Sequence, residues 1–156
     1  MKFLKEKKGF TLLMSVLVAS LVLSIGLGIF SLILRQFILT SSSKESFYAF
    51  YAADTVIECA LYWDVNQGAF ATSSTSGYPS SGVVCAGQDI AVNNWVVTYP
   101  SGGAKTTFDL SFPPQSHCAR VIVTKTPISS TIESRGYNTC STASSRRVER
   151  GIRASY

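Results

Sequence analysis

An uncharged, apolar run near the start of the chain is its clearest pattern. From Phe10 to Leu34, 25 consecutive residues carry no charged side chain. As an α-helix this run would extend about 37 Å, enough to cross the hydrocarbon core of a bilayer. Lysines precede it, so we expect the N-terminal end to stay in the cytoplasm and the rest of the chain to lie outside. The pattern predicts a transmembrane segment over 10–34.

The helical pattern is predicted to continue past this run. Arg35 ends the uncharged stretch, but no Pro and no Gly occur from Ile29 to Gln67. Apolar residues recur at helical spacing, namely Phe50, Ala53, Ile57, Ala60 and Leu61. We therefore predict one helix over 10–64 whose second half is amphipathic and lies on other apolar surface. Its aromatic residues are expected to join the domain core; they are Tyr48, Tyr51, Tyr62 and Trp63.

The polar remainder, 65–156, predicts a small head domain built on an antiparallel sheet. Gln67 to Gly82 is dominated by Ser, Thr, Gly and Pro, which is typical of a loop. Strand-like runs follow, at 92–99, 106–112, 119–126, 131–139 and 147–155. The predicted fold class is α+β, with a long N-terminal helix, half membrane-spanning and half amphipathic, packed on a sheet of four or five strands.

All four cysteines follow the apolar run. An even number on an oxidising side of the membrane indicates two disulfides. A hairpin centred on Ser129 would place Cys118 opposite Cys140, where facing Cβ atoms are close enough to bond. Cys59 would then pair with Cys85 by elimination and tie the helix to the loop region.

The N-terminal segment allows an ordinary signal peptide, an uncleaved signal anchor or a cleaved anchor. A signal peptide has an apolar core of about 7–15 residues followed by a small-residue cleavage site, and this run is longer. The sequence from Lys7 to Leu12, KKGFTL, resembles the type III leader of type IV prepilins. In that family a short basic leader ends in Gly, the cut falls before an apolar residue, and the new amine is methylated. The resemblance implies a cut between Gly9 and Phe10 that removes 1–9 and keeps the helix.

The resemblance implies a structural subunit of a type IV pilus or pseudopilus. Its partners would be other pilin subunits, bound through the N-terminal helix, a prepilin peptidase, an inner-membrane assembly platform and an assembly ATPase. It would lie in the cytoplasmic membrane before assembly and in an extracellular filament afterwards. The alternative is an uncleaved, signal-anchored protein of the cell envelope whose head binds a ligand, which in one version is DNA.

Met14 departs from the family pattern, because the fifth residue of the mature chain is usually Glu. In the family, this Glu of an arriving subunit is thought to pair with the terminal amine of the subunit above it. A buried charge needs such a partner, whereas a subunit with nothing above it does not. Met14 therefore favours a minor, tip or initiating subunit, and a divergent major pilin is the alternative.

A stripe of small residues marks one side of the apolar helix: Ser20, Ser24, Gly28 and Ser31. Their spacing of four, four and three places them on one face. Small residues let helix backbones approach closely in an apolar medium, so the stripe predicts a helix-packing face. A generic transmembrane helix, in which Gly and Ser are common, is the alternative.

Catalytic chemistry is not predicted. His117 is the single histidine, which excludes any mechanism that needs two. The sequence contains no G-x-S-x-G, Walker A or GxGxxG motif. We expect no enzyme activity, no cofactor and no metal site.

The formal charge of +5 reflects the leader, because 10 basic and 8 acidic residues, a net +2, remain after 1–9 are removed. A basic isoelectric point is then no argument for nucleic-acid binding. Four arginines near the end of the chain allow DNA contact, salt bridges between subunits or a solvated edge strand. They are Arg146, Arg147, Arg150 and Arg153.

Overall fold

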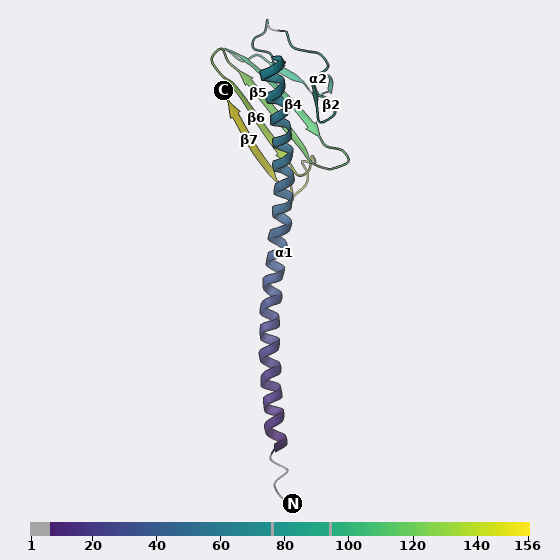
Figure 1. The fold of residues 1–156 in the computed structure, drawn as a ribbon, viewed down its shortest axis with the longest axis vertical. Coiled ribbons are helices and arrows are strands. Elements are labelled where there is room, and N and C mark those ends of the chain that lie inside the picture. The colour runs from purple at the N-terminus through teal and green to yellow at the C-terminus, as the bar shows by residue number, and fades with distance from the viewer. Residues whose placement is uncertain (1–6, 76, 94) are drawn as a thin grey trace, which may run out of the picture. The chain divides into compact units, whose positions relative to one another are not determined.

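A computed structural model describes residues 7–75, 77–93 and 95–156. The chain divides into two compact units, Met1–Ser42 and Ser43–Tyr156, and helix α1, Lys7–Gln67, contributes to both (Figure 1). The fold class is α+β, as the sequence predicts: one long N-terminal helix and a five-stranded antiparallel sheet. The described helix includes Lys7, three residues before the predicted start. It ends three residues later than predicted, because no Pro or Gly interrupts it between Ile29 and Gln67.

The sheet of the second unit has the strand order β3-β4-β5-β6-β7, with all neighbours antiparallel. Its strands are β3 (Val96–Thr98), β4 (Ala104–Ser111), β5 (Cys118–Lys125), β6 (Ser130–Tyr137) and β7 (Glu149–Ser155). A small hairpin, β1 (Val84–Cys85) and β2 (Gln88–Asp89), and the short helix α2 (Ile90–Asn93) precede it. The predicted strand over 92–99 is wrong in its first part, because α2 runs into it and only β3 is extended.

Alternating side chains give the sheet two different faces. On the inner face, apolar residues of β4 and β5 such as Phe108, Val121 and Val123 are fully buried. The C-terminal part of α1 lies across this face (Figure 1), and its buried residues complete the core. The outer face carries charged residues instead, including Asp109 on β4, Arg120 on β5 and Arg135 on β6 in one registered row.

The helix contacts the sheet through small side chains. Its buried apolar positions are Ala49, Ala52, Ala53, Val56, Ile57 and Ala60. On β6, Gly136 lies so close to the helix that a Cβ atom there would stand 2.5 Å from the backbone nitrogen of Ala53. The prediction that four aromatic residues of α1 join the core is wrong for Tyr48, Tyr51 and Tyr62, which are exposed. Trp63 packs at the edge of the core.

The β5–β6 hairpin has a different centre from the predicted one. Lys125 pairs with Ser130, and the backbone N–H of Thr126 donates to the carbonyl oxygen of Ser129 at 2.9 Å. Pro127 therefore occupies the first central position of the turn, where its fixed φ is favoured. The predicted centre at Ser129 is wrong, and Cys118 faces Tyr137 instead of Cys140.

A buried carboxylate near the end of α1 connects three distant parts of the second unit. The side chain of Asp64 is fully buried, and Lys125 Nζ on β5 lies 2.5 Å from its Oδ1. The hydroxyl of Tyr156 donates to the other carboxylate oxygen. Burial and this hydrogen bond raise the pKa of Tyr156. The three residues hold the end of the helix, the end of β5 and the C-terminal residue together.

Candidate functional site

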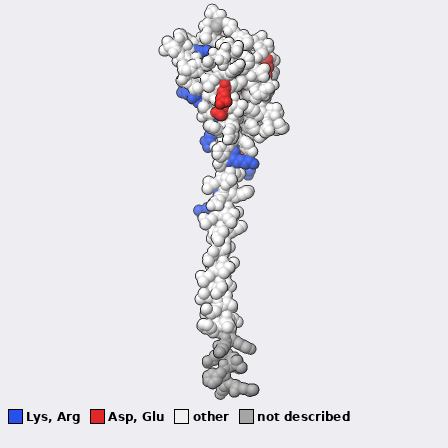
Figure 2. Space-filling view, in the orientation of Figure 1, with Lys and Arg blue, Asp and Glu red and all other residues white. Residues whose placement is uncertain are grey.

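The apolar part of α1 offers an uninterrupted hydrophobic surface in the first unit. Large side chains from Phe10 to Leu34 are exposed, and Phe10 itself keeps 67% of its surface. Along this segment the face drawn in Figure 2 carries no charged atoms between the residues shown in grey and the first basic side chains. The helix is long and apolar enough to cross a membrane, a test that a signal sequence near the N-terminus also passes.

The predicted small-residue stripe lies on a continuous helix. Ser20 donates through Oγ to the carbonyl oxygen of Leu17, and Ser24 to that of Ser20, both at 2.8 Å. A Cβ atom at Gly28 would meet nothing within 4 Å. The hydroxyls of Ser20 and Ser24 are thus satisfied by their own helix, which allows this part of the face to enter an apolar medium without a polar partner.

The predicted processing site lies at the beginning of α1. Helical backbone starts at Lys7, so Gly9 and Phe10 both fall inside the first turns of the helix. Residues 1–6 of the predicted leader lie outside the described residues. Met14 is exposed on the same apolar surface as Phe10.

One of the two predicted disulfides is confirmed. Cys59 on α1 is bonded to Cys85 on β1, with their Cα atoms 5.9 Å apart. Cys118 and Cys140 are free thiols, so the second bond is not formed in the structure. The two thiols are neighbours nevertheless: burial, followed by a hydrogen bond with Cys140, raises the pKa of Cys118 to about 12. They meet because the loop after β6 returns to the start of β5, where the backbone N–H of Cys140 donates to the carbonyl oxygen of Ser116.

The four C-terminal arginines do not form one patch. Arg146 and Arg147 precede β7, although a strand was predicted from 147. Arg150 donates through Nε to Ser46 Oγ on α1 at 2.7 Å, whereas Arg153 pairs in register with Glu133 of β6 and stands on the outer face. A surface that binds DNA phosphates needs its cations on one side, so this arrangement gives the DNA interpretation no support.

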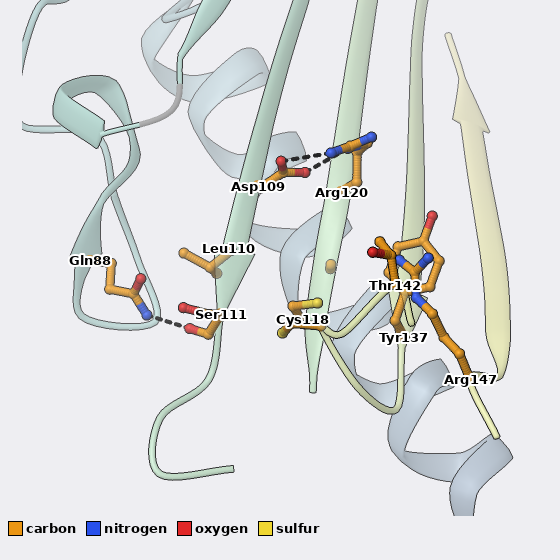
Figure 3. Close-up of a pocket in the computed structure, with 11 residues that line it drawn as sticks. Gln88, Asp109, Leu110, Ser111, Cys118, Arg120, Tyr137, Thr142 and Arg147 are labelled. Carbon is orange, nitrogen blue, oxygen red and sulfur yellow. Dashed lines mark hydrogen bonds and ion pairs between the residues drawn. The ribbon is translucent and has the colours of Figure 1, made fainter. Parts of the chain in front are cut away.

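A cavity of about 240 Å³ lies on the outer face of the sheet (Figure 3), and we call it the outer-face cavity. Ends of β4, β5 and β6 form its floor, and the loop from Asn138 to Val148 and the β1–β2 hairpin border it. Its lining consists of Gln88, Asp109, Leu110, Ser111, Cys118, Ala119, Arg120, Tyr137, Cys140, Thr142 and Arg147.

Charged groups in this cavity differ in their pairing. Arg120 donates to both carboxylate oxygens of Asp109, from Nε at 2.7 Å and from Nη2 at 2.9 Å. The guanidinium carbon of Arg147 lies 3.8 Å from the centroid of the Tyr137 ring, a cation–π contact. The Nε atom of Arg147 is buried and has no hydrogen-bond partner among the described residues.

The single histidine is held by aromatic rings. His117 stacks on Tyr48 of α1 and contacts Phe112, with ring centroids 5.9 and 5.2 Å away. Within the described ranges, no three His, Cys, Asp or Glu side chains come together as metal ligands would.

Sequence reasoning missed the polar connections that hold the second unit together. Besides the contacts of Asp64, the buried Asn138 donates to Glu45 on α1 and accepts from the backbone N–H of Val148. Asn138 and Glu45 are 93 positions apart, so no local pattern signals their contact.

No family of known proteins, no curated protein and no solved structure matches this chain. Its long apolar helix and antiparallel sheet are compatible with a pilin-like fold.

Proposed function

We propose that the chain is a structural subunit of a type IV pilus or pseudopilus filament. The observation that carries the proposal is the KKGFTL junction, placed directly at the start of an uncharged run of 25 residues. A leader of this kind is cut on the cytoplasmic side of the run, so the apolar helix remains for packing against other subunits. The chain would act mechanically, by docking through α1 and presenting the head outside the cell.

The exposed apolar surface of α1 supports this proposal in physical terms. In water, the large side chains between Phe10 and Leu34 would be costly to leave uncovered. A bilayer can cover them before assembly, and neighbouring helices can cover them afterwards. The stripe of Ser20, Ser24, Gly28 and Ser31 is the side on which another helix backbone can approach most closely.

Met14 narrows the proposal to a minor, tip or initiating subunit. A carboxylate at this position would need a cationic partner on the subunit above it. Methionine needs none and adds to the apolar surface. The head would then stand at the end of the filament.

The intact mass of the chain, purified from cells that contain a prepilin peptidase, tests the proposal. We expect a loss of Met1 to Gly9 and the addition of one methyl group. Cells that lack the peptidase provide the control and should give the full-length chain. A full-length, unmethylated chain in the presence of the peptidase would instead identify an uncleaved, signal-anchored envelope protein.

A further inference from the structure

We propose that the outer-face cavity binds a small carboxylate through the side chain of Arg147. This inference concerns the head alone and holds whether or not the chain enters a filament. It rests on the charge of the cavity, the geometry of Arg147 and the size of the space.

Arg147 is the uncompensated charge in the cavity lining. Asp109 and Arg120 neutralise each other through two hydrogen bonds. The Cys118 thiol is neutral at physiological pH, since burial and its contact with Cys140 raise its pKa to about 12. The lining residues therefore carry one net positive charge, located on Arg147.

Nearby acids outside the lining already have a cationic partner. Arg135 lies on the outer face, 2.6 Å from Glu133 and 3.7 Å from Glu149, and Arg153 faces Glu133 in register, so two cations lie beside these two acids. Among the described residues, neither acid forms an ion pair with Arg147. The chain thus places a cation beside the cavity without supplying its anion.

The orientation of Arg147 leaves a donor for a ligand. One face of its guanidinium group lies on the Tyr137 ring, so the N–H groups in the plane of the guanidinium remain available. Nε is buried and a ligand cannot reach it, so the donors left for a ligand are the two Nη groups, for which no hydrogen bond is found among the described residues. Figure 3 shows the guanidinium beside Tyr137 and Thr142, at the border of the cavity.

A carboxylate fits this donor better than other anions do. A guanidinium edge binds a carboxylate through two parallel hydrogen bonds. One uncompensated positive charge matches a monoanion, whereas a phosphate dianion would leave an excess negative charge in a half-enclosed space. The volume of about 240 Å³ lies below the roughly 300–1,000 Å³ of pockets for drug-sized ligands, so only a few atoms can accompany the carboxylate.

The carboxylate could come from a free organic acid or from an acidic side chain of another polypeptide. Acetate represents the first source. N-acetyl-glutamate amide, whose side-chain carboxylate is flanked by two amides, represents the second. Both carry the chemistry that Arg147 recognises, and they differ in what surrounds it.

Titration of the full chain in detergent micelles, followed by ¹⁵N NMR, tests the proposal. We expect acetate to shift the Nε–H signal of Arg147 and the amide signal of Thr142 along a saturating curve. Arg147→Lys keeps the charge but loses the planar donor. In this variant the dissociation constant for acetate, obtained from the Thr142 amide shift, should rise at least about tenfold. Arg153→Lys is the matched control, because Arg153 is exposed on the outer face and does not line the cavity.

The outcomes separate the possibilities. Shifts that grow linearly, or that sodium chloride reproduces at equal ionic strength, would overturn the proposal. Saturation that persists unchanged in Arg147→Lys would overturn the role of this residue. Tighter binding of N-acetyl-glutamate amide than of acetate would identify a polypeptide side chain as the source, and the reverse order a free acid. If Arg147→Lys lowers the unfolding midpoint, the variant is set aside. The titration of the Nε–H signal in the unchanged chain then tests the proposal by itself.

Discussion

At Gly136 the backbones of α1 and the sheet lie close together. A Cβ atom there would overlap the carbonyl oxygen of Ala49 and stand 2.5 Å from the nitrogen of Ala53. Backbone atoms cannot move aside as a flexible side chain can, so helix and sheet would have to separate. Glycine at this position, together with the alanines of the facing helix, sets the distance between the two layers.

We expect Gly136→Ala to lower the free energy of unfolding by about 1–3 kcal/mol, as overpacking in a filled core does. Gly151→Ala on the neighbouring strand is the control, because its Cβ would meet nothing closer than 3.9 Å. Denaturant unfolding of both variants measures the difference. Equal stability of the two would show that the helix does not pack on β6 as described.

Asp64 and Lys125 form an ion pair whose carboxylate is fully buried and whose ammonium is largely buried. Removal of one partner leaves the other as an unpaired charge in the interior. We expect Lys125→Met to lower the free energy of unfolding by about 3 kcal/mol. Lys105→Met, on the exposed face of β4, provides the control and should change the free energy of unfolding little. If both substitutions lower the free energy of unfolding equally, Lys125 does not stabilise the buried carboxylate of Asp64.

At the scale of elements, the Cys59–Cys85 bond attaches the β1–β2 hairpin to α1. It closes a loop with a sequence separation of 26, which includes the Ser- and Thr-rich segment after the helix. Closing a loop of this length contributes roughly 3–4 kcal/mol by restricting the unfolded chain. The helix end, the hairpin and the start of the sheet should therefore unfold together.

A pair of double variants tests this contribution. We expect the melting temperature of Cys118→Ala/Cys140→Ala to fall when reductant is added, because its remaining disulfide is then lost. Cys59→Ala/Cys85→Ala should already melt lower and should not respond to reductant, since Cys118 and Cys140 are free thiols. A further fall on reduction of the second variant would show that Cys118 and Cys140 bond in the purified protein.

The sequence predicts best those elements that neighbouring residues determine, and less well those that depend on tertiary contacts. The helix and most strands follow from local patterns, namely the absence of Pro and Gly from Ile29 to Gln67 and the alternation in β4 to β6. The predicted β5–β6 register is wrong because Pro127 favours the first central position of a turn, which moves the centre of the hairpin away from Ser129. The buried helix face was misjudged because aromatic size suggests burial, while the approach of Gly136 admits only small side chains.

The candidate site was less predictable than the fold. Gly9, Phe10 and the small-residue stripe lie in one continuous segment, so the sequence could single them out. In the sequence, Arg147 is one of four similar arginines, because its contact with Tyr137 depends on how the loop after β6 returns over the outer face. The bonds from Asp64 to Lys125 and to Tyr156 span 61 and 92 positions, so they needed the tertiary structure.

At the scale of the whole molecule, the two units present different surfaces. The apolar segment of α1 carries exposed hydrophobic side chains and no charge before Arg35. The head has a filled core, a disulfide and charged side chains on its outer face. If the first unit joins the subunit to a filament, the position of the subunit along the filament should depend on the N-terminal residues of the helix rather than on the head.

Met14→Glu tests this dependence. In cells that contain the assembly machinery, we expect the unchanged chain to be present at few copies per filament. The new carboxylate could pair with the terminal amine of a subunit above, so the variant should be incorporated along the filament in larger amounts. Quantitative mass spectrometry of sheared filaments measures the ratio of this subunit to the main one, and Met14→Gln, which has a similar size but no charge, is the control. An unchanged chain that already makes up most of the filament would contradict the tip assignment, and equal incorporation of the Glu and Gln variants would show that charge pairing does not determine the position.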